Sequence, residues 1–175
     1  GRDPDPYVIT RALSTFERTL ISGNSSYDQW LSQGCNNALS LSQQRGRELF
    51  FSERTGCSNC HSGINFTNYA FENNGLYGVY ADPGRMRFTG DPADSARFKV
   101  PTLRNVAVTG PYMHDGSMTD LAQVIEHYNS GGAEHVHKSE LVRPLELREQ
   151  EKEDLVHFLE ALTDVEFLGN RDFRE

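Results

Sequence analysis

The 175-residue sequence contains no run of eighteen apolar residues, so it predicts no membrane-spanning helix. It is also poor in basic residues: 17 lysines and arginines against 25 aspartates and glutamates give a net charge of −8. Nucleic-acid binding needs a clustered basic surface, and the sequence shows none, so DNA and RNA are not expected partners. Three cysteines, Cys35, Cys57 and Cys60, are too few for a disulfide framework.

Apolar residues are scarce as well, at 37% of the chain, and the mean hydropathy is −0.61. A core built from so few apolar side chains is thin, and a bound apolar cofactor would add buried surface that no residue supplies. The length fits one domain over residues 1–175, either alone or as half of a larger protein. Because the chain starts at Gly1, we expect a removed leader or a longer gene product.

Apolar periodicity predicts helices in several segments, with a long irregular segment between them. Asp5 and Pro6 form a helix-start signal for a helix that ends before Gly23. Further helices are expected over 27–31, after a cap at Ser42, over 119–128, and at the C-terminus, where Leu155, Phe158, Leu159 and Leu162 recur. Glycine and proline interrupt residues 65–98, and loops of such length are usually functional. The sequence therefore predicts an all-α fold with long irregular loops.

Cys57, Cys60 and His61 form a Cys-x-x-Cys-His motif, the spacing of covalent c-type haem attachment. Two thiols one helical turn apart can each add to a haem vinyl group, and the neutral imidazole of the next residue can then reach the iron. A thioredoxin-like switch would need a preceding strand, and a zinc site would need a second ligand pair; the sequence shows neither. The motif predicts one covalently bound haem c with His61 as proximal ligand, and leaves Cys35 as an ordinary thiol.

The ligand on the other side of the iron is less clear from spacing. The candidates are Met86, Met113, Met118, His114, His127 and Tyr128. Tyr128 shares a helical face with Leu121 and Ile125, whereas His127 points about 100° away from it. On periodicity alone Tyr128 is most simply a core aromatic residue, so these alternatives stay open.

Four stretches of the chain resemble the C-terminal haem domain of bacterial dihaem cytochrome c peroxidases and MauG-like proteins. They are ITRALSTFERTLISGNSSYD (9–28), RGRELFFSERTGCSNCHSGINFTN (45–68), FKVPTLRNVAVTGPYMHDGSMTDLAQVIEHY (98–128) and LVHFLEALT (155–163). The resemblance implies a periplasmic, cytochrome c-like helical domain whose loops wrap round one haem. It also implies hydrogen peroxide as the oxidant and a second haem domain or a redox protein as partner.

The resemblance further implies individual roles. The proximal ligand of the family matches His61, and its distal ligand lies twelve residues beyond the glycine of the HDG turn, which places it at Tyr128. Tyrosine there is typical of the MauG-like branch, where phenolate oxygen favours ferric or higher iron; the electron-transfer type has methionine. The backbone carbonyls of Thr109 and Pro111 match ligands of a calcium ion that the family's other domain completes.

Arg104, and with it Arg85 and Arg87, are candidate partners for haem propionates because guanidinium matches carboxylate geometry, and His114 is a candidate haem-edge or interface residue. Surface exposure explains Arg85 and Arg87 equally well. No catalytic residue is assigned, because the peroxide-cleaving half of the family carries its own Cys-x-x-Cys-His and this chain has one such motif. Two functions follow: a domain that relays or stores oxidising equivalents for peroxide-dependent chemistry, or a stand-alone monohaem electron carrier.

Overall fold

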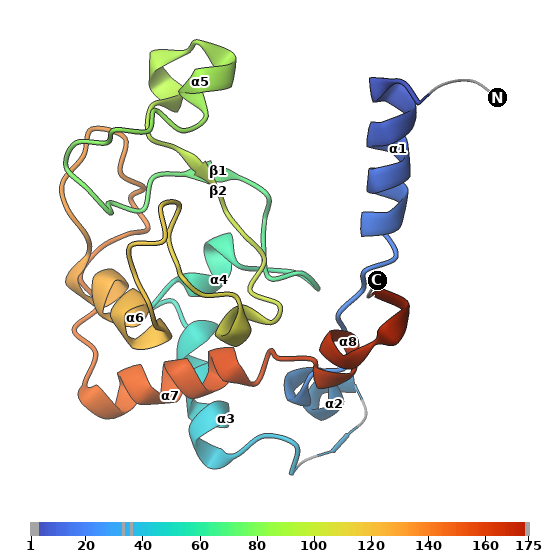
Figure 1. The fold of residues 1–175 in the computed structure, drawn as a ribbon. Helices are drawn as coiled ribbons and strands as arrows, with labels where there is room; N and C mark the ends of the chain where they lie inside the picture. The colour runs from blue at the N-terminus through green and yellow to red at the C-terminus, as the bar shows by residue number, and fades with distance from the viewer. Residues whose placement is uncertain (1–3, 33, 36, 174–175) are drawn as a thin grey trace.

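The computed structural model describes residues 4–32, 34–35 and 37–173, and its described part is rich in helix (Figure 1). The α-helices are α1 (Pro6–Glu17), α2 (Ser26–Ser32), α3 (Leu41–Phe50), α4 (Cys57–Cys60), α5 (Met86–Thr89), α6 (Leu121–Ser130), α7 (Glu149–Glu160) and α8 (Val165–Gly169). Short 3-10 turns lie at η1 (Pro92–Asp94), η2 (Val106–Val108) and η3 (Arg171–Phe173), and the strands are β1 (Phe71–Glu72) and β2 (Phe98–Lys99).

The core forms where α3 and α6 both pack against α7 (Figure 1). Phe158 of α7 is fully buried, and its ring lies 5.2 Å from that of Phe50 on α3 and 6.4 Å from that of Phe66. Gly46 allows α3 to approach this closely, because a Cβ at that position would lie 1.8 Å from the carbonyl oxygen of Asp154. The helices thus form a tight platform beneath the Cys-x-x-Cys-His motif.

The expected helices are present, with different boundaries in two places. Asp5 caps α1 as predicted, since its Oδ1 accepts from the backbone N–H of Val8 at 2.9 Å, but α1 ends at Glu17, well before Gly23. The cap of α3 is Ser40, which forms a capping box with Gln43. The predicted cap at Ser42 was wrong because the Ser42 hydroxyl bonds to Asp154 of α7 instead.

The expectation of an all-α fold needs amending, because two short strands pair within the irregular segment. β1 and β2 run antiparallel, with Phe71 opposite Lys99 and Glu72 opposite Phe98. Such two-residue strands carry too little alternation to be seen in a sequence. The pairing fixes residues 97–101 beside the chain that follows the haem motif. No described helix is long and apolar enough to cross a membrane.

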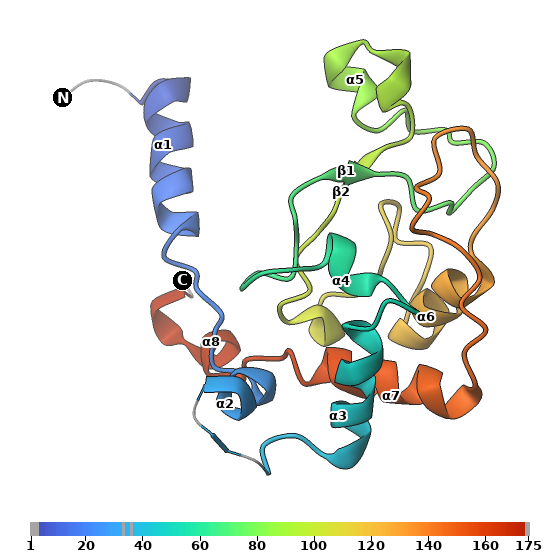
Figure 2. The same cartoon turned by 180° about the vertical axis from the view of Figure 1, so that it is seen from behind.

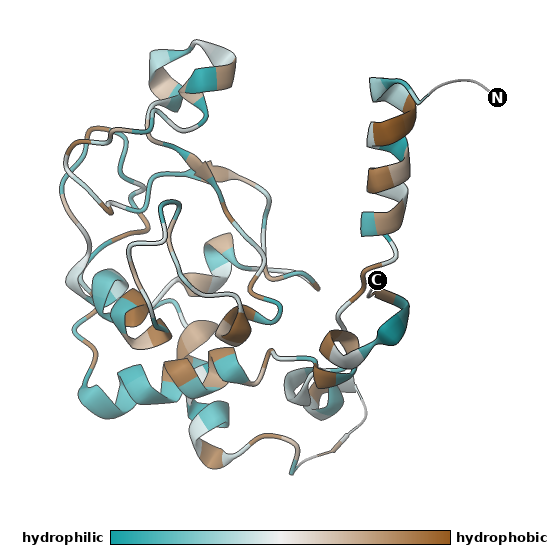
Figure 3. Cartoon of the chain, viewed as in Figure 1, coloured by the Kyte–Doolittle hydropathy of each residue, from teal (hydrophilic) through white to brown (hydrophobic). Residues whose placement is uncertain are grey.

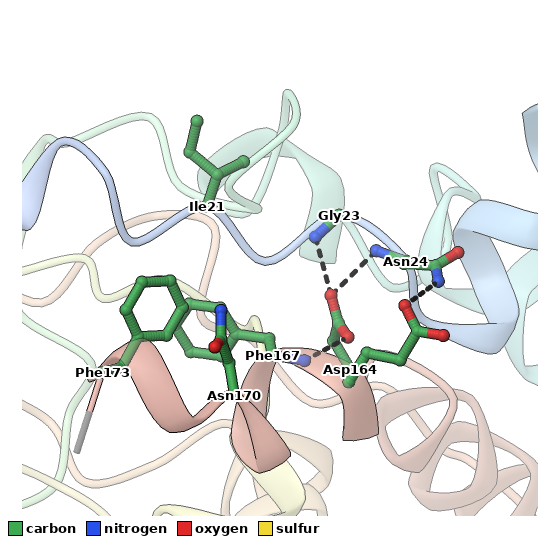
Figure 4. A pocket seen from close by; sticks show the side chains of 8 residues that line it. Ile21, Gly23, Asn24, Asp164, Phe167, Asn170 and Phe173 are labelled. Carbon is green, nitrogen blue, oxygen red and sulfur yellow. Dashed lines mark hydrogen bonds between the residues drawn. The ribbon is translucent and has the colours of Figure 1, made fainter.

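The N-terminal helix α1 stands apart from this core (Figures 1 and 2). None of its residues is buried, although it carries an apolar stripe that includes Ile9, Leu13 and Phe16 (Figure 3). The chain after α1 is tied to the C-terminal segment through Asp164, whose carboxylate accepts from the backbone N–H groups of Gly23 and Asn24, each at 2.9 Å (Figure 4).

A shallow pocket of about 430 Å³ lies beside this junction, lined by residues of 21–24 and 164–173 (Figure 4). The carboxylates that line it accept hydrogen bonds from other groups of the protein. Asp164 also caps α8 by accepting from Phe167, and Glu166 accepts from the Asn24 side chain at 2.8 Å. The pocket therefore reflects the way the two ends of the domain are joined, and it lies outside the haem motif.

Candidate functional site

The Cys-x-x-Cys-His motif forms a single helical turn, α4. Gly56 begins it in the left-handed region (φ 63°), and the backbone N–H of His61 donates to the carbonyl of Cys57 at 3.0 Å. Downstream, the N–H of Asn68 donates to the carbonyl of Cys60 at 2.8 Å, which folds the next loop back over the turn. Local hydrogen bonds alone thus set both thiols on one turn, with the imidazole directly after it.

Both motif cysteines are partly buried thiols. Burial raises the pKa of Cys57, and burial together with the nearby charge of Glu72 raises the pKa of Cys60. A redox-active cysteine needs a lowered pKa, so the environment disfavours a thiol–disulfide switch. A zinc site is also unsupported, because the described residues contain no group of three or more His, Cys, Asp or Glu side chains that could hold a metal ion.

His61 has the protonation and orientation that iron ligation requires. Desolvation lowers the pKa of His61, and backbone hydrogen bonds at Phe66 and Pro101 raise it by less. The imidazole is therefore neutral at pH 7. Its Nδ1 lies 3.0 Å from the Phe66 carbonyl oxygen. An Nδ1–H group donates to that oxygen and leaves the lone pair of Nε2 free to bind a metal ion. Two thiols and one oriented neutral imidazole on one turn are a donor set that fits haem c.

Tyr128 comes to this turn from a distant part of the chain. Asp120 caps α6 by accepting from Gln123 at 2.9 Å, and Tyr128 lies near the other end of that helix. Its side chain packs against the core together with Cys57. Desolvation raises the pKa of Tyr128, a hydrogen bond from Asn74 opposes the rise, and the thiols of Cys57 and Cys60 add to it. The hydroxyl therefore lies within electrostatic range of both motif cysteines.

The other candidate axial ligands have protein partners of their own. His127 Nε2 lies 3.0 Å from the carbonyl oxygen of Asn74, and Met113 Sδ accepts from Asn74 Nδ2 at 3.3 Å. The exposed ring of His114 stacks on Phe98 with the centroids 4.0 Å apart. Met86 begins α5, and Met118 pairs with Tyr112 through the backbone. Tyr128 packs against the same core as Cys57, and its role as distal ligand stays a prediction.

The arginines expected at the propionates are engaged with carboxylates. Arg104 is buried, with 8% exposure, and binds Asp28 through two hydrogen bonds of 2.6 and 2.9 Å. Arg85 pairs with Asp94 at 3.0 Å, and Arg87 pairs with Asp82 at 3.1 Å. These contacts do not favour a propionate role for any of the three.

Thr109 and Pro111 lie on an exposed loop between η2 and α6. The described residues place no carboxylate cluster beside them, so calcium at their carbonyls stays a prediction.

One neighbour of the site has no signal in the sequence: Asn74 contacts Tyr128, His127 and Met113. It belongs to the irregular segment, where no periodicity marks which side chains face inward.

Comparison with known proteins identifies longer relatives. The chain is 40% identical over 156 residues to the methylamine utilization protein MauG of Methylorubrum extorquens, which covers 88% of this chain and 43% of that protein. It is 34% identical over 194 residues to the cytochrome-c peroxidase IdrP1 of Pseudomonas sp. (strain SCT), covering 93% and 51%. The chain thus spans about half the length of the curated relatives it matches. No protein-family profile matches it.

A solved structure supports the same grouping. The crystal structure of a MauG-like protein associated with microbial copper homeostasis superposes with a TM-score of 0.87 at 35% identity. The match covers 96% of this chain and 56% of that one.

Proposed function

Because the chain belongs to the family of MauG and the bacterial cytochrome c peroxidases, we propose that it is one haem-binding half of a haem-dependent oxidoreductase. In this role it relays or stores oxidising equivalents for peroxide-dependent chemistry. The observation that carries the proposal is that Tyr128 packs against the same core as Cys57, next to the motif whose His61 ring lies 3.0 Å from the Phe66 carbonyl oxygen. Tyrosine ligation suits iron that is held oxidised, whereas a high-potential carrier is better served by thioether.

The residues of the site have separate tasks in this proposal. Cys57 and Cys60 anchor one haem through thioether bonds, and His61 takes the proximal position with its ring fixed by the Phe66 carbonyl. Tyr128 takes the distal position, and the amide of Asn74 donates to its oxygen, which stabilises negative charge there. A bound haem supplies one-electron chemistry, and the protein groups tune it through ligand identity and hydrogen bonding.

The surroundings of the domain follow from the same proposal. Hydrogen peroxide is the oxidant, and electrons pass to or from a second haem domain or a redox protein. Haem c attachment and the family relationship favour a periplasmic location. The acidic surface, with a net charge of −8, favours a basic partner protein over an acidic one.

The ligand assignment is tested by Tyr128→Phe in the haem-loaded protein. We expect covalent haem to be retained while the ferric optical and EPR spectra change, because the distal oxygen is lost. Tyr112→Phe is the matched control: this half-buried tyrosine packs against the same core but donates to the Val106 carbonyl at 2.9 Å. Unchanged spectra in Tyr128→Phe would show that another group fills the distal position, and would leave the electron-carrier function as the better account.

A further inference from the structure

We propose that Arg97 binds the propionate carboxylates of the haem, a role that the sequence favours for Arg104, Arg85 or Arg87. The inference rests on the proposed function only in requiring that haem is bound. Haem brings two carboxylates into the protein, and a carboxylate removed from water needs a charged or hydrogen-bonding partner. An arginine is suited to this because its planar guanidinium can donate two parallel hydrogen bonds.

Arg97 differs from the other three arginines in having no carboxylate partner within the part of the chain that the structure describes. None of the ion pairs among the described residues includes it. Its Nε is buried, yet no hydrogen-bond acceptor from the described residues reaches it. A buried donor without an acceptor is costly and rare in folded proteins, so it indicates a missing acceptor.

The backbone holds Arg97 firmly in place, which makes a loose surface side chain an unsatisfactory explanation. Its carbonyl accepts from the N–H of Arg85 at 2.9 Å, and the N–H of the neighbouring Ala96 donates to Pro83 at 2.9 Å. Gly84 lies so close that a Cβ there would come within 2.5 Å of the Arg97 carbonyl oxygen. The side chain therefore starts from a fixed point.

That fixed point leads to the proximal side of the motif. Residues 97–101 run from Arg97 to Pro101 beside residues 67–70, and the N–H of Asn68 in that neighbouring segment donates to the carbonyl of Cys60 at 2.8 Å. Between them, Val100 donates to Ala70 at 2.8 Å and accepts from Thr67 at 2.7 Å. Arg97 thus lies on the strand that is hydrogen-bonded to the segment directly after the motif.

The distal side leads to the same place. Phe98, next to Arg97, lies 6.1 Å from the ring of Tyr80. The hydroxyl of Tyr80 donates to Asn73 at 3.3 Å, and the carbonyl oxygen of Asn74 lies 3.0 Å from Nε2 of His127, the residue before Tyr128. Phe98 also pairs with Glu72 in the antiparallel ladder. The strand that carries Arg97 is therefore linked both to the segment after the motif cysteines and to the end of α6 that carries Tyr128, which is the position expected for a group at the haem edge.

One other arginine has a buried Nε without an acceptor among the described residues, Arg47. Its guanidinium lies over the ring of Trp30 at 4.8 Å and over that of Phe51 at 5.3 Å. These cation–π contacts stabilise its charge without an anion. Arg47 is therefore accounted for by its aromatic neighbours, and Arg97 is left as the propionate partner.

The test compares Arg97→Gln with Arg87→Gln in the haem-loaded protein. Arg87 is the matched control because it lies near the same strand but is exposed and paired with Asp82. The reduction potential is measured against pH, and the propionate bending band is followed by resonance Raman spectroscopy. In Arg97→Gln we expect a lower potential, a displaced Raman band, and a propionate pKa raised by roughly 1–3 pH units, because an adjacent positive charge is lost. Arg97→Lys, which keeps the charge, should restore most of the potential but not the Raman band.

The possible outcomes separate this inference from the proposed function. A wild-type chain with no covalently bound haem on a denaturing gel would overturn the proposed function and the Arg97 assignment with it. Covalent haem with Arg97→Gln matching wild type in both measurements would overturn the Arg97 assignment alone. Equal effects of Arg97→Gln and Arg87→Gln would do so too, since they would show only a general electrostatic influence.

Discussion

The buried ion pair between Asp28 and Arg104 gives a direct test of what Arg104 does. In this structure Arg104 stabilises the protein fold, because its guanidinium binds Asp28 on α2 and its Nε donates to the Ile64 carbonyl at 2.7 Å. It also lies over the Phe66 ring at 5.2 Å. We therefore expect Asp28→Asn to destabilise the haem-loaded chain. If Arg104 bound a propionate instead of Asp28, Asp28→Asn would be nearly neutral.

The size of the effect follows from burial. The side chains of Arg104 and Asp28 are 6% and 13% exposed, and removal of one partner from a buried pair costs about 3–5 kcal/mol. Arg104 keeps its contacts with Ile64 and Phe66, so the low end, about 3 kcal/mol, is expected. For a chain of this size that corresponds to a decrease of roughly 6–12 °C in Tm.

The measurement is urea or thermal unfolding of the haem-loaded chain, followed by far-UV circular dichroism at pH 7. Arg87→Gln is the control, because its exposed pair with Asp82 should contribute no more than about 1 kcal/mol. Desolvation tends to raise the pKa of Asp28, but hydrogen bonds from Arg104 and Ser25 hold it below its ordinary value of 3.8. The stabilisation is therefore present above pH 3.8 and is lost as the pH falls through the folded-state pKa. If Asp28→Asn unfolds like Arg87→Gln at pH 7, the assignment of Arg104 to the fold is wrong.

Gly46→Ala should cost at least about 2 kcal/mol in unfolding free energy, because its Cβ would meet the Asp154 carbonyl at 1.8 Å; Gly23→Ala, with no atom within 4 Å of its Cβ, should be nearly neutral. Asp164→Ala should lower Tm more than Asp120→Ala, since both lose a helix cap worth about 1 kcal/mol but only Asp164 also binds Gly23 and Asn24; equal losses would contradict the proposed junction of the two termini. Arg45 holds the pKa of Asp154 below 3.8, so the stability gap between wild type and Asp154→Asn should narrow as the pH falls through that pKa; a constant gap in pH-dependent unfolding would contradict it. The haem-loaded chain should turn over hydrogen peroxide poorly with any electron donor, and fast steady-state turnover would refute its role as the relay half.

The sequence by itself determined the local chemistry of this protein. Cys57, Cys60 and His61 lie within one helical turn, so their relative positions follow from helix geometry and a few backbone hydrogen bonds. The same is true of the cap at Asp5 and of the apolar face of α7, where local spacing decides the outcome. The family relationship is carried by the same stretches of sequence and was confirmed by comparison.

The tertiary structure alone decided which distant side chains pair. Arg104 matches a propionate as well as it matches Asp28, and only the folded chain shows that its guanidinium binds Asp28 of α2. In the sequence, Ser42 is as good a helix cap as Ser40. In the folded chain the Ser42 hydroxyl donates a hydrogen bond to Asp154 instead. Side-chain chemistry fixes what a residue can bind, whereas long-range packing fixes which partner lies within hydrogen-bond distance. Among the described residues, the Nε of Arg97 has no such partner, and that could not be seen until the chain was folded.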